Sequence, residues 1–234
     1  MVNSTIFLDI LPFAQRQLWS QLSATPDSFV LYGGTALALQ LRHRESIDFA
    51  FFSAQEFDPD KLGNSISYLK GGGIKHIDRN TLTVSVSIGE ESVHCSFFGG
   101  LSMQHVKPVI VASNGLKIAS ILDVFGTKCA TVIKRSEYKD YIDLIAILEK
   151  TGLSLTDGIA AACSIYGPSF NPLLALKAVT YTADLKPQLE PTENQLLLDS
   201  VKDVNLGSLP SITPLGDIGV HPTSTDKVPR GPSP

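Results

Sequence analysis

The chain has 234 residues, which is enough for one domain or for a domain with a small appendage. Hydrophobic residues make up 43% of it and can form a real core, while a net charge of −4 excludes a global basic field that would attract nucleic acid or an anionic membrane. No apolar run approaches the roughly 18 residues that cross a bilayer, the N-terminus lacks a signal-peptide pattern, and three scattered cysteines favour a reducing compartment, so we expect a soluble, cytoplasmic protein without a membrane partner.

The periodicity of apolar residues predicts an α/β sandwich in the first part of the chain. Helices are expected where apolar side chains recur at spacings of three and four, and strands where apolar runs are short or alternate strictly with polar residues. Because helices and strands follow each other, the sheet is expected to mix parallel and antiparallel strands. The expected helices cover 9–24, 35–44 and 58–69, and the expected strands cover 29–32, 47–52, 81–88 and 92–98.

The rest of the chain divides into two parts by composition. From about Ser113 the pattern is helical, which predicts a helical subdomain over 113–186, after an α/β domain over 1–112. Residues 187–234 hold eight of the fourteen prolines and one brief apolar run, NQLLLDSV. A Pro-rich segment with little to bury predicts a largely disordered tail, above all beyond about residue 205.

One strand–turn–helix–strand unit has the features that a transfer of a nucleoside monophosphate requires. Glycines at a strand-to-helix turn allow backbone N–H groups to approach a triphosphate, and here Gly33, Gly34 and Thr35 follow the strand over 29–32. Magnesium is held by carboxylates at alternate strand positions. Asp48 is one such residue, yet the next position on the same face of the strand, two residues later, is Ala50. Ser96 occupies the place of a third carboxylate on a later strand. The alternatives without a nucleotide site are that the glycines form a simple turn and that Asp48 forms a salt bridge.

The helical part offers a second group of polar residues. Lys128, Thr131 and Arg135 lie on one helix face, which is either a solvated face or a stripe that faces phosphates. Lys139 and Asp143 are spaced to pair along the next helix, so Asp143 is either a structural ion-pair partner or, with Asp140, part of a site. The chain has no zinc-ligand spacing, and its aromatic residues are most simply core.

These motifs resemble those of the nucleotidyltransferase-fold toxins of the AbiEii/AbiGii type, the toxin half of type IV toxin–antitoxin systems. The stretch GGTALALQLRHRESIDFAFFS is similar to the family's first motif, and LDVFGTKCATVIKRSEYKDYIDL is similar to its later ones. The resemblance covers roughly residues 29–185 and departs from the family at Ala50. The matching residues are Gly33, Gly34, Arg44, Ser46 and Asp48 in the first motif and Lys128, Thr131, Lys139, Asp140 and Asp143 in the later ones.

The resemblance implies a nucleotidyltransferase-like mixed sheet, NTP as substrate, Mg²⁺ as cofactor and an RNA acceptor such as tRNA, or a protein acceptor. It also implies a cognate antitoxin as partner. Asp48 would hold the metal, Lys128 would neutralise developing charge, and Asp140 or Asp143 would act as base or orient the acceptor. The remaining matched residues would bind the nucleotide: Gly33, Gly34, Thr35, Arg44, Ser46, Thr131 and Lys139.

The alternative is a degenerate relative, a pseudoenzyme that serves as a nucleotide-binding or protein-interaction module. One carboxylate out of three holds Mg²⁺ only loosely, so Ala50 and Ser96 favour this alternative. The two hypotheses differ in a geometric expectation. Transfer chemistry requires Asp48, Asp140 and Asp143 to meet in one coordination sphere.

Overall fold

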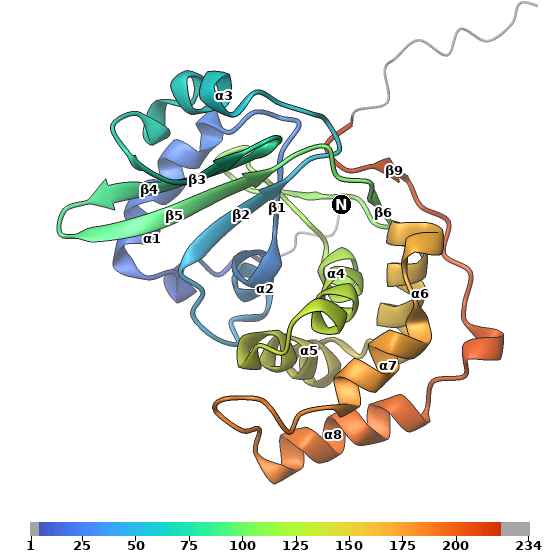
Figure 1. Ribbon diagram of the computed structural model, residues 1–234. Helices are drawn as coiled ribbons and strands as arrows, with labels where there is room; N and C mark the ends of the chain where they lie inside the picture. The colour runs from blue at the N-terminus through green and yellow to red at the C-terminus, as the bar shows by residue number, and fades with distance from the viewer. Residues whose placement is uncertain (1–4, 221–234) are drawn as a thin grey trace, which may run out of the picture.

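The computed structural model describes residues 5–220, and its main layer is a seven-stranded mixed sheet with the strand order β3-β4-β5-β2-β1-β8-β7 (Figure 1). A separate two-stranded sheet pairs β6 with β9. The α/β class expected from the sequence is thereby confirmed. The strands are β1 (Val30–Tyr32), β2 (Asp48–Phe52), β3 (Gly73–Asp78), β4 (Thr81–Ile88), β5 (Glu91–Phe98), β6 (Gln104–His105), β7 (Ile110–Val111), β8 (Lys117–Ile118) and β9 (Gly216–Asp217).

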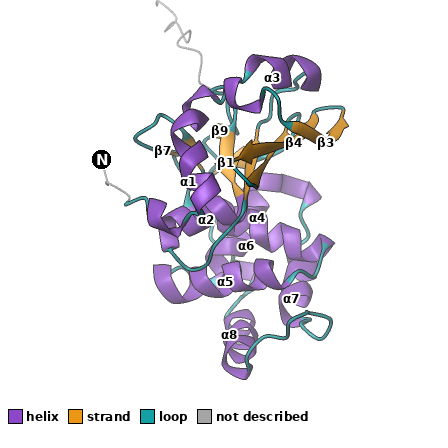
Figure 2. Ribbon diagram, turned by 90° about the vertical axis from the view of Figure 1, so that its left-hand side faces the viewer, coloured by secondary structure: helices purple, strands orange, loops and turns teal. Residues whose placement is uncertain are grey.

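The helices of the second half form a layer of their own, and both ribbon views place α5, α7 and α8 at the opposite end of the molecule from α3 (Figures 1 and 2). None of the described helices is long and apolar enough to cross a bilayer. The helices are α1 (Phe13–Trp19), α2 (Gly33–Leu41), α3 (Pro59–Ser65), α4 (Ile121–Lys134), α5 (Tyr138–Thr151), α6 (Leu155–Tyr166), α7 (Pro172–Thr180) and α8 (Pro191–Lys202).

Strand alternation sorts the side chains of the central strands onto two faces. Strand β2 runs parallel to β5, and Phe49 and Phe51 on its one face are fully buried in the core. Its other face pairs residue by residue with β5: Asp48 with His94, Ala50 with Ser96, and Phe52 with Phe98. The sequence pattern predicted these faces correctly.

Three strands of the main sheet were not expected from the sequence, and two of them lie on either side of the boundary predicted at residue 112. Strand β3 follows the glycine run, and β7 and β8 lie within or beside the segment that was predicted to be helical. Strand β8 pairs in parallel with β1 through Leu31 and Ile118. The sheet therefore extends past residue 112, because its two last strands bracket that position, and the helical layer begins with α4.

The expectation of a disordered tail from residue 187 is wrong for residues 187–220. Helix α8 buries Leu197 completely, and residues 203–220, which we call the C-terminal strap, return from α8 to the sheet. There the backbone N–H of Ala54 donates to the carbonyl of Ile218 at 3.0 Å, and Ile218 is 1% exposed. The few apolar residues of the segment are thus enough to anchor it. Residues 221–234 lie outside the described residues.

The predicted helix over 9–24 is present in broken form. Pro12 precedes α1, and the following turn over 20–24 is a 3₁₀ helix.

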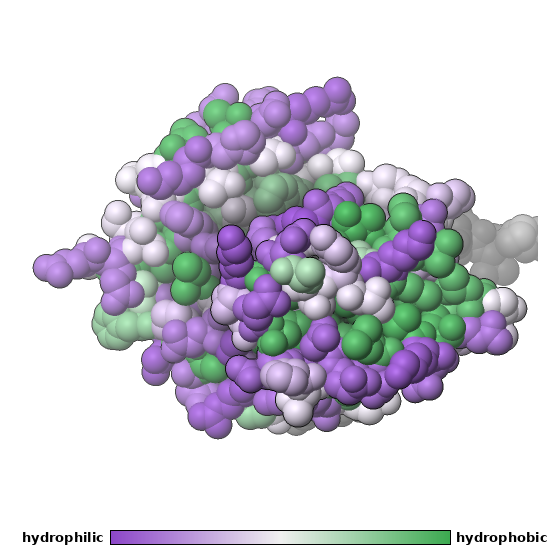
Figure 3. Space-filling view, turned by 60° about the horizontal axis from the view of Figure 1, so that its bottom comes forward, coloured by the Kyte–Doolittle hydropathy of each residue, from purple (hydrophilic) through white to green (hydrophobic). Residues whose placement is uncertain are grey.

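The three cysteines are free, as expected, and Cys95 and Cys129 are buried. Figure 3 looks onto the helical side, where hydrophobic side chains gather on part of an otherwise polar surface; Leu173 and Leu174 of α7 are about half exposed.

Candidate functional site

A cleft of about 460 Å³ opens beside the β2–β5 face described above. Its walls come from the β1–α2 turn, the two strands, helix α4 and the ends of α5 and α6. Five of the lining side chains are basic and only one is a carboxylate. The lining residues are Tyr32, Gly33, Gly34, Arg44, Asp48, Ala50, Phe52, Ser96, Phe98, Thr127, Lys128, Thr131, Lys134, Arg135, Lys139 and Tyr166.

The glycine turn gives the cleft close access to backbone. Gly33 has φ of +76°, a left-handed conformation that favours glycine. A Cβ on Gly34 would lie 2.5 Å from the Arg44 Nη2 atom, so the missing side chain lets the guanidinium lie against the start of α2. No side chain caps this helix at Tyr32, and its first N–H groups therefore have no intrahelical or side-chain cap partner.

Two residues that were predicted to bind the nucleotide make hydrogen bonds within the fold. The Thr35 hydroxyl lies 2.9 Å from Ser46 Oγ and 2.5 Å from the carbonyl oxygen of Asp48, and Thr35 is 1% exposed. Neither Thr35 nor Ser46 is among the residues that line the cleft. They hold the first turn of α2 against the start of β2, which fixes Asp48 beside the glycines.

The strand face that would hold a metal carries one carboxylate. The Asp48 side chain is 50% exposed and lies 3.4 Å from Nδ1 of His94. Ala50 and Ser96 are adjacent in register, and the Ser96 hydroxyl pairs with that of Thr83 at 3.0 Å. Within residues 5–220, no three His, Cys, Asp or Glu side chains are grouped so that they could hold a metal ion. The residues present do not fit a two-metal centre.

Asp140 and Asp143 belong to a buried ion cluster together with Lys128, Arg44 and Arg135. The Lys128 Nζ atom lies 2.6 Å from Asp140 and 2.5 Å from Asp143, and both carboxylates are completely buried. Arg135 donates to Asp140 at 2.9 Å. Both carboxylates are thus bound by basic side chains, and within residues 5–220 they form no group with Asp48 that could hold a metal ion.

Arg44 and His43 complete the shell around Asp143. Arg44 donates to both oxygens of this carboxylate, at 2.7 and 3.0 Å, and His43 Nε2 lies 2.8 Å from one of them. Burial alone would raise the pKa of Asp143. The hydrogen bond from His43 and the charges of Lys128 and Arg44 outweigh burial and hold this pKa well below its usual range. Asp143 is thus ionised at neutral pH, where it pairs with Lys128 and Arg44.

The basic wall differs in detail from the sequence prediction. Lys128 is 5% exposed, so it does not lie on a solvated face, and the Thr131 hydroxyl donates to the Thr127 carbonyl. Lys139 pairs with Glu137 at 2.9 Å and not with Asp143. Sequence reasoning missed Lys134, which lines the cleft from the last turn of α4. Its spacing of three from Thr131 places it near the predicted face and was the available signal.

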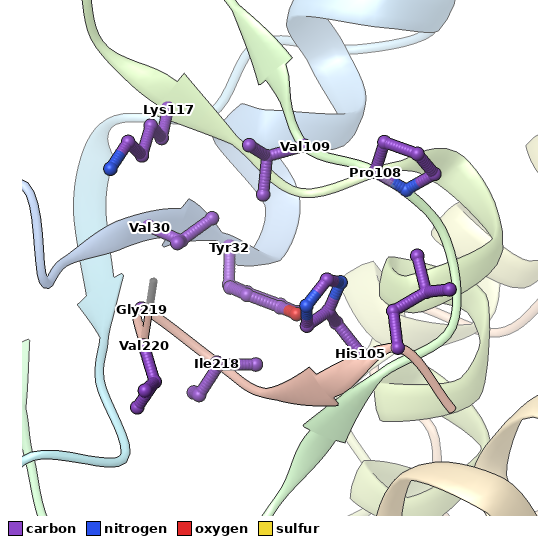
Figure 4. Close-up of a pocket in the computed structure, with 10 residues that line it drawn as sticks. Val30, Tyr32, His105, Pro108, Val109, Lys117, Ile218, Gly219 and Val220 are labelled. Carbon is purple, nitrogen blue, oxygen red and sulfur yellow. The ribbon is translucent and has the colours of Figure 1, made fainter. Parts of the chain in front are cut away.

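A second pocket has a volume of about 320 Å³ and shares the lining residue Tyr32 with the cleft (Figure 4). Its walls are mostly apolar, and the Tyr32 ring enters it with the hydroxyl toward His105. Burial raises the pKa of Tyr32 well above its usual value, so this phenol remains protonated. Ile218 and Val220 of the C-terminal strap close one side of the pocket.

Comparison with known proteins relates the site to a family. A family model described as the nucleotidyl transferase AbiEii toxin of type IV toxin–antitoxin systems matches residues 17–107, which include the glycine turn and both central strands. An uncharacterized protein of Aquifex aeolicus, aq_aa25, is 29% identical over 133 residues, or 56% of this chain. That match spans 63% of the Aquifex protein, slightly less than two thirds of its length.

Two solved structures share the fold over most of the chain. MenT4, a nucleotidyltransferase toxin from Mycobacterium tuberculosis, has a TM-score of 0.57 at 15% identity and covers 86% of this chain and 84% of its own. JHP933 from Helicobacter pylori has a TM-score of 0.51 at 17% identity and covers 81% and 88%. At such identities the likeness concerns the fold. The later motifs, with Lys128 and Asp143, lie outside the residues that the family model matches. For the first motif the resemblance is confirmed: residues 17–107 match the AbiEii nucleotidyltransferase toxins, and the chain has a nucleotidyltransferase fold.

Proposed function

We propose that the cleft binds the polyphosphate of a nucleoside triphosphate and that the protein is a nucleotidyltransferase-like toxin relative without two-metal transfer chemistry. The observation that carries the proposal is the charge of the lining, five basic side chains against the single carboxylate of Asp48. Basic side chains and uncapped helix N–H groups are the usual ligands of phosphate oxygens. The cleft therefore has local positive charge although the whole chain is acidic.

The buried ion cluster holds the basic side chains of the cleft in place before any ligand binds. Asp140 and Asp143 neutralise part of the charge, yet an ammonium group has three donors, and Lys128 uses two on these carboxylates. The third can be offered to the cleft that Lys128 lines. Lys134 adds a basic side chain at the cleft for which the described residues provide no ion pair. Phosphate binding would thus need little rearrangement.

The alternative function is the transfer itself, and Asp48 is the observation that favours it. This half-exposed carboxylate lies beside the glycine turn and would have to hold Mg²⁺ together with substrate oxygens and water. The acceptor would then be an RNA such as tRNA, or a protein, and the toxin resemblance adds a cognate antitoxin as partner. Ala50 and Ser96 argue against this alternative, because they leave the metal face without two of its charges.

Calorimetry with each NTP, in the presence of Mg²⁺ and of a chelator, tests the proposal. We expect binding that persists without metal, and Lys134→Glu should weaken it about tenfold, because one charge-assisted contact becomes a repulsion. Lys75→Glu, on the exposed edge strand β3, is the matched control and should bind as the wild type does. Absence of binding at millimolar NTP would overturn the proposal.

A gain-of-function variant separates the two alternatives. Labelled NTP is incubated with total tRNA and with protein, and the product of the wild type is compared with that of the double variant Ala50→Asp, Ser96→Asp. We expect no labelling by the wild type and Mg²⁺-dependent labelling by the double variant, since the substitutions restore two carboxylates beside Asp48. Labelling by the wild type that Asp48→Ala abolishes would instead establish transfer.

A further inference from the structure

We infer that the cleft has a nucleobase-stacking subsite, formed by an aromatic wall of Tyr32, Phe52, Phe98 and Tyr166. This inference rests on the proposed function, because it assigns the base end of a nucleotide whose phosphates lie against the basic wall. The ligand class is a mononucleotide with an intact base, bound in the cleft without a metal ion. All four residues are among those that line the cleft.

The aromatic wall is distinct from the aromatic core of the sheet. Phe51 and Phe97 are fully buried on the core face of their strands. Phe52 and Phe98 come one residue later, so alternation turns them to the other face, where they pair in register and are partly exposed. They occupy the same face as Asp48 and Ala50. Aromatic surface therefore continues the strand face on which a nucleotidyltransferase would carry metal ligands.

The rings support one another in a fixed arrangement. Tyr32 stacks on Phe52 with centroids 5.1 Å apart and an interplanar angle of 9°, and Phe98 meets Phe52 edge to face at 5.6 Å and 89°. Tyr32 is 1% exposed and backs the wall, while the partly exposed rings reach the cleft. A preformed aromatic surface of this kind loses little conformational entropy when a flat ligand stacks on it.

The two walls are arranged in the order of the parts of a nucleotide. A Cβ on Gly33 would lie 3.9 Å from that of Ala50, so the glycine turn and Arg44 mark the phosphate end. Phe52 lies two residues further along β2, about 6.6 Å at the usual strand rise. Along β2, from Ala50 to Phe52, the cleft lining therefore changes from basic to aromatic side chains. A triphosphate at the glycine turn would thus direct its sugar and base toward Phe52 and Phe98.

The chemistry of the aromatic wall also predicts how selective it is. Stacking on an aromatic side chain strengthens the binding of a base about tenfold, and it tolerates any base because every base has a π-face. The polar neighbour on this face, Ser96, already pairs with Thr83. We therefore expect a preference for purines over pyrimidines through their larger area and little discrimination between adenine and guanine.

The test compares ATP with inorganic tripolyphosphate, which has the same phosphates and no base, by calorimetry on the full chain. ATP should bind about tenfold more tightly. Phe98→Leu keeps the apolar volume and removes the ring, so it should remove that advantage and leave tripolyphosphate binding unchanged. Phe98→Tyr should restore it. Phe13→Leu, at an exposed aromatic outside the cleft, is the control.

The outcomes separate the subsite from the proposed function. Equal affinities for ATP and tripolyphosphate in the wild type overturn the subsite and leave phosphate binding in place. Failure of both ligands to bind overturns the proposed function and the subsite with it. A Phe98→Leu variant that loses both ligands alike shows that the ring acts only on the fold of the cleft and also overturns the subsite.

Discussion

At the scale of single residues, the buried ion cluster determines what the two aspartates of α5, Asp140 and Asp143, can do. Asp143 receives donors from Arg44, Lys128 and His43, so its four lone-pair positions are largely used. A buried charge without such partners would be costly, and the cluster therefore acts as one unit. The consequence for function is that basic side chains reach the cleft while their counter-charges remain inside the protein.

Removing the charge of Asp143 should destabilise the fold strongly. We expect Asp143→Asn to lower the free energy of unfolding by about 3–5 kcal/mol, because Arg44 and Lys128 then lose a buried partner. Urea denaturation at pH 7 measures the change. Asp199→Asn on α8 is the control, since that carboxylate is exposed and pairs with Lys202 and Gln195 at the surface. No measurable change is expected there.

The difference in stability between the wild type and Asp143→Asn should depend on pH. The folded state depresses the pKa of Asp143, so the unfolded chain binds this proton more readily. The stabilisation is complete above the unfolded pKa of about 4 and is lost as the pH falls below it. The stability difference between wild type and Asp143→Asn should therefore shrink from pH 6 to pH 3. A difference that stays constant over this range would contradict the assignment.

At the scale of elements, the contact between α4 and α6 within the helical layer positions the wall of the cleft that α4 provides. A Cβ on Gly126 would lie 2.9 Å from the Ala162 backbone nitrogen, and a Cβ on Gly158 would lie 2.8 Å from the Phe125 ring. The helices approach each other at these two glycines. Since α4 carries Lys128 and Lys134, this contact sets the position of the basic wall.

Adding one methyl group at Gly126 tests how closely α4 and α6 are packed. Gly126→Ala should lower stability by about 1–3 kcal/mol, because the methyl group meets backbone that cannot move aside. Gly63→Ala in α3 is a matched control with a Cβ at an ordinary 3.5 Å from Leu82, and it should stabilise by about 0.4–1 kcal/mol. Thermal unfolding followed by circular dichroism compares the two. Equal effects of both substitutions would show that α4 and α6 tolerate separation.

The sequence predicted those elements whose burial repeats with a clear period. Helices α4 and α5 and the alternating strand β4 were predicted because one face is apolar. Strand β3 is exposed along its whole length and has a bulge between Ile74 and His76, so no alternation marks it. Strands β7 and β8 have two residues each, too few for any periodicity.

The candidate site shows the same limit. The glycine turn and Asp48 are local in sequence and were identified as a motif, whereas Phe52 and Phe98 were assigned to the core with their neighbours Phe51 and Phe97. Both rings are only partly buried, and alternation placed both of them on the face of Asp48. The ion cluster joins residues a hundred positions apart, and no spacing rule could pair Arg44 with Asp143.

At the scale of the whole molecule, the C-terminal strap ties the helical layer back to the sheet. The Leu215 N–H donates to His105, and Ser164 of α6 donates to the carbonyl of Ile212. Ile218 then packs into the core beside the second pocket. The strap thus links α8, α6 and the central strands, and the two halves predicted as separate domains share one core.

Truncating the side chain that anchors the strap should lower the stability of the whole fold. We expect Ile218→Ala to lower the free energy of unfolding by about 2–5 kcal/mol, since a buried aliphatic side chain leaves a cavity. Leu215→Ala in the same segment should have little effect, because that side chain is 56% exposed. Urea denaturation monitored by Trp19 fluorescence provides the comparison. Similar losses for both variants would mean that Ile218 is not the anchor.

The strap also imposes an order on biosynthesis. Ala54 and Met103 leave the ribosome early, yet their backbone partner Ile218 is translated long afterwards. A nascent chain can therefore form much of the sheet while the wall behind Tyr32 is still open. We expect the second pocket, which Ile218 lines together with Tyr32, to reach its final form only after residue 218 has been translated, so that a message cut short upstream yields a product in which this pocket is incomplete.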